Sequence, residues 1–144
     1  MATLDLTNFL PFRLNQIAAE ISGRLSTIYA ERFGLDVPQW RVMATLVDRD
    51  GLSAQEIVES TRTHKSTISR AVQALIQRGL VTAGADDQDG RARKLALTKA
   101  GRQLMDEIVP LAQSFERDLL RQVGGLESRQ FLDGLGALEN VLRR

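Results

Sequence analysis

Apolar residues recur every three or four positions along most of this chain, a spacing typical of amphipathic helices. The pattern predicts one long helix over residues 4–33, a second that follows an N-cap at Thr98 and runs to about Val123, and a last helix over about 127–142, with shorter helices between them. The apolar stripe of the first comprises Leu10, Leu14, Ile17, Ile21, Leu25 and Ile28, and that of the last comprises Phe131, Leu135, Leu138 and Leu142.

Two of the shorter helices carry clear start signals. Asp36 precedes Pro38 and Gln39, an arrangement that favours a capping box with proline in the first turn. Ser53 followed by Glu56 predicts a second capping box. Trp40, the single tryptophan, falls on the side of its helix that we expect to be buried.

A third short helix is predicted over residues 63–78, with Thr63 as its N-cap and Gly79 as its left-handed C-terminal residue. Its apolar positions are Ile68, Val72, Leu75 and Ile76. Its outward positions are Lys65, Ser66, Ser69, Arg70, Gln73 and Gln77. Together with the preceding short helix, it predicts a helix-turn-helix.

A small β-hairpin is predicted after this helix. Residues 80–83 and 93–98 have strand character, and the polar residues between them form the expected turn. The chain is therefore expected to be mainly α, a helix-turn-helix of residues 36–98 with a hairpin, flanked by helical regions 4–33 and 99–142.

Charge is distributed unevenly along the chain. The formal net charge is +1, but residues 60–99 contain eight Lys and Arg against three Asp, and the flanks are mildly acidic. A basic middle carrying hydroxyl side chains suits contact with DNA phosphates and base edges. A solvated basic helix is the alternative for this helix taken alone.

Composition narrows the function classes. The chain has 144 residues, enough for one domain, and no cysteine, which excludes disulfides and thiolate metal sites. No apolar run is long enough for a membrane span and no export signal is apparent, so a cytoplasmic location is expected. With a single histidine and no evident acid/base constellation, we expect no enzyme activity and no cofactor.

The hairpin tip, residues 86–91, carries three Asp and one Arg. A calcium loop placed with Gly90 at its sixth position would have alanine at both essential acidic positions, so calcium binding is rejected. Instead, Arg91 is expected to enter a minor groove, oriented by Asp89, with Arg93 and Lys94 near phosphates. A solvated charged turn remains the alternative.

The terminal helices carry more apolar surface than a small DNA-binding unit needs. Such faces suit a two-fold dimer, which would present two recognition helices about 34–36 Å apart to successive major grooves. Completion of the monomer's own core is the alternative.

Three segments resemble the MarR family of bacterial winged helix-turn-helix transcription regulators: PQWRVMATL, KSTISRAVQALIQRGLV and DGRARKLALTKAG. The resemblance implies a homodimer with intertwined N- and C-terminal helices, a recognition helix in the major groove of a palindromic operator, and a wing over the minor groove. The implied DNA-binding residues are Lys65, Ser66, Thr67, Ser69, Arg70, Asp89 and Arg91, and the argument on the hairpin adds Arg93.

The resemblance also implies a repressor that releases DNA when a small aromatic or phenolic ligand binds. The absence of cysteine excludes a thiol-based peroxide sensor. Candidate pocket residues combine apolar and basic side chains on the first two helices: Arg13, Asn15, Tyr29, Trp40 and Arg41. The competing hypothesis is a winged-helix module that binds proteins and not DNA.

Overall fold

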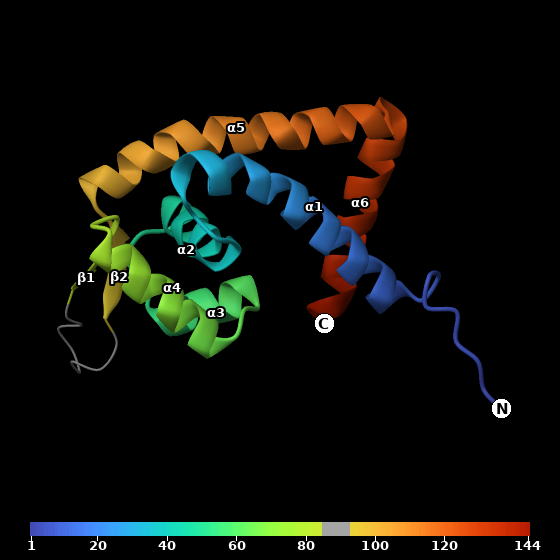
Figure 1. The fold of residues 1–144 in the computed structure, drawn as a ribbon. Coiled ribbons are helices and arrows are strands. Elements are labelled where there is room, and N and C mark those ends of the chain that lie inside the picture. Colours follow the sequence, from blue (N-terminus) through green and yellow to red (C-terminus); the bar gives the residue numbers. More distant parts are fainter. Residues whose placement is uncertain (85–92) are drawn as a thin grey trace. The chain divides into compact units, whose positions relative to one another are not determined.

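The predicted mainly helical architecture is confirmed in a computed structural model, which describes residues 1–84 and 93–144 (Figure 1). Within those ranges the elements follow the order α1–α4, β1, β2, α5, α6. Their bounds are α1 Leu10–Phe33, α2 Val37–Asp48, α3 Ala54–Thr61, α4 Lys65–Gln77, β1 Val81–Gly84, β2 Lys94–Leu97, α5 Lys99–Val123 and α6 Gly125–Leu142.

The chain forms two compact units, Met1–Val109 and Pro110–Arg144. The first contains the helix-turn-helix, the hairpin strands, α1 and the start of α5. The second contains the rest of α5 and α6. The predicted assignment of residues 4–33 and 99–142 to dimerisation stays a prediction.

Helix α1 begins six residues later than predicted, at Leu10. A start at residue 4 would place Pro11 in the helix interior, where it has no N–H to donate and its ring clashes with the preceding turn. Asp5 instead holds a short turn, since its carboxylate accepts hydrogen bonds from Thr7 and Asn8. These bonds lower the pKa of Asp5.

The predicted capping box of α2 is confirmed, whereas at α3 the predicted N-cap Ser53 is confirmed without the reciprocal bond from its own N–H to Glu56 that a capping box requires. At α2 the Asp36 carboxylate accepts the Gln39 N–H at 2.8 Å, and the Gln39 side chain accepts the Asp36 N–H at 3.0 Å. At α3 the Ser53 hydroxyl accepts the Glu56 N–H at 3.1 Å. Glu56 in turn accepts from the Ser53 hydroxyl at 3.4 Å.

The predicted N-cap of α4 was wrong by one residue. His64 caps the helix, with Nδ1 accepting the Ser66 N–H at 3.4 Å. Thr63 is occupied elsewhere, because its hydroxyl accepts from Arg41 and donates to the Thr61 carbonyl. The predicted left-handed conformation of Gly79 is confirmed by its φ of +73°.

One apolar position of α4 also differs from the prediction. Ile68, Val72 and Leu75 are buried as expected, but Ile76 is 40% exposed and Ala71 is buried in its place. Eight residues beyond Ile68, position 76 is turned by about 80° from Ile68 around the helix axis. Ile76 thus lies at the edge of that face.

The two strands pair antiparallel in the register Val81 with Leu97 and Gly84 with Lys94. The far edge of β2 is also occupied, because Leu95 exchanges backbone hydrogen bonds with Gly51 and Leu52. Leu95 and Leu97 are buried on the face predicted for them. The stem of the hairpin is therefore fixed to the helix-turn-helix.

The core of the first unit lies where α2 packs against α3, α4 and β2. Its fully buried side chains come mainly from α1, α2, α3, α4, β1 and the start of α5, and α4 contributes Ile68 and Leu75. This packing sets the direction in which the opposite face of α4 points.

Helix α5 starts as predicted, with the Thr98 hydroxyl accepting the Gly101 N–H at 3.0 Å. It continues through Pro110. In the second unit, Gly124 takes a positive φ of +112° and the Ser128 hydroxyl donates to the Leu120 carbonyl. Among the described residues, no helix is sufficiently long and apolar to traverse a membrane.

Candidate nucleic-acid interface

The solvent face of α4 gathers polar and basic side chains opposite its buried face. Lys65, Ser66, Ser69 and Arg70 are exposed, whereas Thr67 is half-buried. Gln73 and Gln77 continue the exposed row. A helix with this face outward presents hydrogen-bond donors and positive charge to a partner, as major-groove recognition requires.

The other predicted DNA contacts lie on the hairpin. Arg93 immediately precedes β2, and both Arg93 and Lys94, the first residue of β2, are exposed. Asp89 and Arg91 lie outside the described residues, so their predicted placement at the tip stays a prediction.

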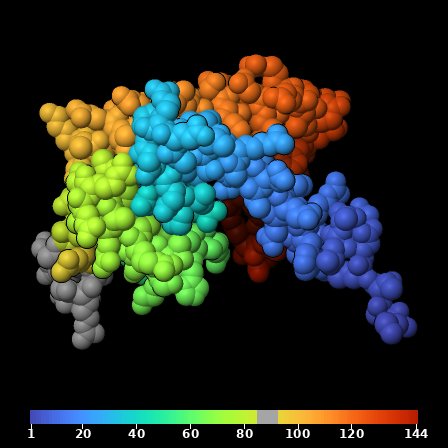
Figure 2. All heavy atoms as spheres, in the orientation of Figure 1, coloured from blue at the N-terminus to red at the C-terminus, as the bar shows by residue number. Residues whose placement is uncertain are grey.

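A groove of about 420 Å³ runs along α4 beside the hairpin stem. Apolar side chains from α3, α4 and both strands form much of its lining, and Arg93 is the charged residue among the described residues that line it. Figure 2 shows α3 and α4, in green, next to the yellow strand residues on one continuous surface. The lining residues are Ser53, Ala54, Gln55, Ser69, Val72, Gln73, Ile76, Ala83, Arg93 and Leu95.

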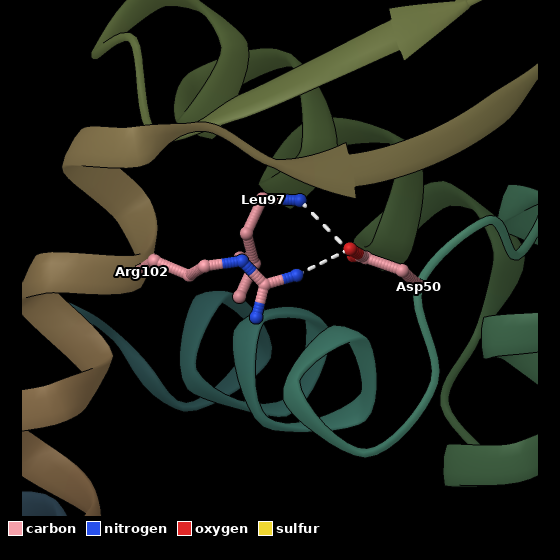
Figure 3. Close-up of polar contacts among 3 residues, drawn as sticks. All are labelled: Asp50, Leu97 and Arg102. Carbon is pink, nitrogen blue, oxygen red and sulfur yellow. Dashed lines mark hydrogen bonds and ion pairs between the residues drawn. The ribbon is translucent and has the colours of Figure 1, made fainter.

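Asp50 fixes the stem of the hairpin to its neighbours (Figure 3). Its carboxylate accepts the Leu97 N–H at 3.3 Å and forms an ion pair with the Arg102 guanidinium. The loop after α2, the end of β2 and the first turn of α5 therefore meet at one side chain. This contact fixes the end of β2 to the loop after α2 and to the start of α5.

Replacing Asp50 by alanine is expected to lower the free energy of unfolding by about 1–2 kcal/mol, because the partly buried Leu97 N–H loses its acceptor. Arg102→Ala is the matched control. It breaks only a largely exposed ion pair and should cost less than about 1 kcal/mol. Urea unfolding of both variants measures the difference, and equal losses would contradict the role given to the Leu97 bond.

The predicted pocket residues separate into two groups. Tyr29 and Trp40 stack with ring centroids 5.0 Å apart and an interplanar angle of 12°, and Arg41 follows Trp40 on α2. Arg13 and Asn15 are exposed on α1, about 20 Å or more along the helix from Tyr29. Within one chain, only Tyr29, Trp40 and Arg41 are brought together.

Tyr29 is fully buried, and its hydroxyl has no hydrogen-bond partner among the described residues. Burial raises the pKa of the phenol, with a smaller opposing effect from the Arg41 charge. The phenol therefore stays protonated at neutral pH and is a hydrogen-bond donor. Most buried polar groups in proteins are paired, so an orphaned donor beside an aromatic stack marks a candidate ligand contact.

Three side chains that organise this region were not singled out from the sequence. Arg78 bonds to the end of α1, and Asp50 and Arg102 join the hairpin stem. All three look like ordinary surface charges in the sequence. Their partners lie 44 or more residues away, and local spacing carries no signal for such contacts.

Comparison with known proteins agrees with this architecture. A family model described as the MarR family matches residues 33–92. The transcriptional repressor IacR of Pseudomonas putida is 31% identical over 101 residues, which cover 69% of this chain and 58% of that protein.

Solved structures match almost the whole chain. The MarR family regulator SPO1453 from Silicibacter pomeroyi DSS-3 is 28% identical with a TM-score of 0.83, covering 97% of this chain and 99% of that one. PcaV from Streptomyces coelicolor, solved with its natural ligand, is 25% identical with a TM-score of 0.77, covering 97% and 98%.

Helix-turn-helix, paired strands and exposed polar face together define a winged helix-turn-helix protein of the kind that regulates transcription. The chain belongs to the MarR family of transcriptional regulators.

Proposed function

We propose that this chain is a homodimeric repressor that binds a palindromic DNA operator and releases it on binding a small aromatic or phenolic ligand. The exposed row Lys65, Ser66, Ser69 and Arg70 on α4 carries the proposal. It places donors and positive charge on the solvent face of a helix whose opposite face is fixed in the core.

Within this proposal α4 enters the major groove and the hairpin lies over the adjacent minor groove. Arg93, at the edge of the groove beside α4, contacts the phosphate backbone between them. Arg91 enters the minor groove and Asp89 orients it. Thr67 is half-buried, so its contribution is smaller than that of its exposed neighbours.

Exposed apolar residues support the homodimer. On α1, Leu10, Ile17 and Ile21 are exposed, and so are Phe131 and Leu142 on α6. Apolar faces of this kind on terminal helices suit burial against a second copy. Two copies related by a two-fold axis would read two half-sites of a palindrome.

The ligand proposal rests on the stack of Tyr29 on Trp40, the orphaned phenol donor and the nearby Arg41 cation. An aromatic ring suits the stack, and a carboxylate or phenolate suits Arg41. That PcaV binds a natural ligand supports a small effector for this chain. Arg13 and Asn15 remain proposed ligand contacts, and they would supply a basic and an amide group from a separate part of α1.

Selection of bound sites from random duplex DNA, combined with light scattering on the protein and its complex, tests the proposal. A palindromic site bound by two chains is expected, with affinity that falls steeply as salt rises. The competing interaction module would be favoured if the protein were a monomer that binds a protein partner without salt dependence and binds no duplex even at low salt. Titration of the complex with sodium salicylate and related aromatic acids then tests release.

Replacing Tyr29 by phenylalanine is expected to raise the free energy of unfolding by about 1 kcal/mol, because the buried hydroxyl lacks a partner in the free protein. The same change should weaken binding of an aromatic acid that accepts from the phenol. Chemical unfolding and calorimetry measure the two effects. Destabilisation by Tyr29→Phe would show that the hydroxyl is already satisfied.

A further inference from the structure

The C-terminal end of the recognition helix α4 is bonded to the end of α1, and the turn before its N-terminal end is bonded to α2. At the C-terminal end, Arg78 donates from Nη1 to the Gly34 carbonyl at 2.9 Å and from Nη2 to the Phe33 carbonyl at 3.0 Å. At the N-terminal end, Arg41 of α2 donates from Nη1 to the Thr63 hydroxyl at 3.2 Å.

The Arg78 contact uses acceptors that a helix end leaves free. The last carbonyls of α1 have no partner within the helix and carry the negative end of its dipole. Gly34 has a left-handed φ of +67°, which favours glycine, and a Cβ there would make an ordinary van der Waals contact of 3.7 Å with the guanidinium. The planar guanidinium fork reaches both carbonyls at once, which a lysine ammonium cannot reproduce.

The Arg41 contact fixes the turn immediately before α4. Thr63 lies between Arg62, in a left-handed conformation with φ of +53°, and the N-cap His64. Its hydroxyl also donates to the Thr61 carbonyl at 3.3 Å. Arg41 therefore holds the turn whose geometry sets where α4 begins.

Both contacts connect α4 to the surroundings of the Tyr29–Trp40 stack. Phe33 follows Tyr29 by one turn of α1, and the Leu35 N–H bonds to the Tyr29 carbonyl at 3.2 Å. Arg41 is adjacent to Trp40, which stacks on Tyr29. A shift of the aromatic pair would therefore be passed to both ends of α4 through hydrogen-bonded side chains.

We propose that Arg41 and Arg78 are positioning residues that fix the two ends of α4 to the Tyr29–Trp40 stack, so that the state of the stack sets how α4 is presented to DNA. The inference rests on the proposed DNA-binding function. By thermodynamic reciprocity, DNA binding must also change the state of the stack.

The only tryptophan of the chain lies in this stack, so its fluorescence reports on the coupling without a known effector. The experiment titrates the full-length protein with its selected duplex and records Trp40 emission and DNA affinity together. The variants are Arg78→Ala, Arg78→Lys, Arg41→Lys and, as matched control, Arg49→Ala, which removes an exposed arginine at the end of α2.

The unchanged protein and Arg49→Ala are expected to show a DNA-dependent emission change. Arg78→Ala and Arg78→Lys should lose most of that change and bind DNA about tenfold more weakly, since one anchored end of α4 is released. Arg41→Lys should have a smaller effect in the same direction. The salt slope of binding should stay unchanged in all variants, because neither arginine is assigned to a phosphate.

Different failures have different meanings. Absence of duplex binding by the unchanged protein refutes the proposed function. Normal DNA binding with no emission change, or with an emission change retained in Arg78→Lys, overturns the coupling alone. A salt slope lowered by about one unit in Arg78→Ala would make Arg78 a phosphate contact and also overturn it. Circular dichroism with urea unfolding checks that each variant is folded. If Arg78→Ala does not fold, Arg78→Lys, which keeps the positive charge, carries the test.

Discussion

Replacing Arg70 by alanine should weaken binding to the selected operator by about 1–3 kcal/mol and remove discrimination at one base pair of each half-site. Arg70 is exposed on α4 one residue after Ser69, and the buried Ile68 and Ala71 on either side fix its direction. An arginine held in this way can donate two hydrogen bonds to a guanine edge. Binding isotherms against operators changed at each position measure the loss.

Arg24→Ala is the matched control, because Arg24 is an exposed arginine on α1 outside the helix-turn-helix. It should leave both affinity and base discrimination unchanged. A uniform loss across all operator sequences in Arg70→Ala, with a lower salt slope, would instead assign Arg70 to a phosphate.

Gly101→Ala is expected to lower the free energy of unfolding by about 1–3 kcal/mol, although alanine is the better helix former. Gly101 lies in the first turn of α5, and a Cβ there would lie 2.1 Å from the Leu80 carbonyl oxygen. That oxygen accepts the Thr98 N–H at 3.0 Å. The backbone must therefore move where the hairpin stem meets α5, and urea unfolding measures the cost.

Gly134→Ala supplies the comparison within α6, since a Cβ at Gly134 meets nothing within 4 Å. There the helix propensity of alanine acts alone, and stability should rise by as much as about 1 kcal/mol. If both variants behaved alike, the close approach at Gly101 would not be the cause.

Local chemistry predicted much of the fold. Asp36 with Gln39, Ser53 and Gly79 each act as expected because a cap depends on side chains within three or four residues. The predicted N-cap of α4 was wrong because Thr63 and His64 can both cap a helix. The Thr63 hydroxyl instead accepts a hydrogen bond from Arg41, which lies 22 residues away in the sequence.

The candidate sites were predicted less evenly. The exposed row on α4 follows from helical periodicity, so Ser69 and Arg70 could be found from spacing alone. The aromatic cluster was predicted only in part, although the predicted helix over residues 4–33 already separates Arg13 from Tyr29 by about 24 Å. The contacts of Asp50 and Arg78 depend on tertiary packing, which one sequence does not encode in any local pattern.

The pairing of Leu95 with residues 51 and 52 also limits how copies of this protein can associate. Since β2 is bonded on both sides, in the described part of the chain only β1, with four residues, offers a strand edge for intermolecular extension. Short edges of this kind resist uncontrolled β-aggregation. The hairpin stem therefore presents little edge for strand pairing between copies of this protein.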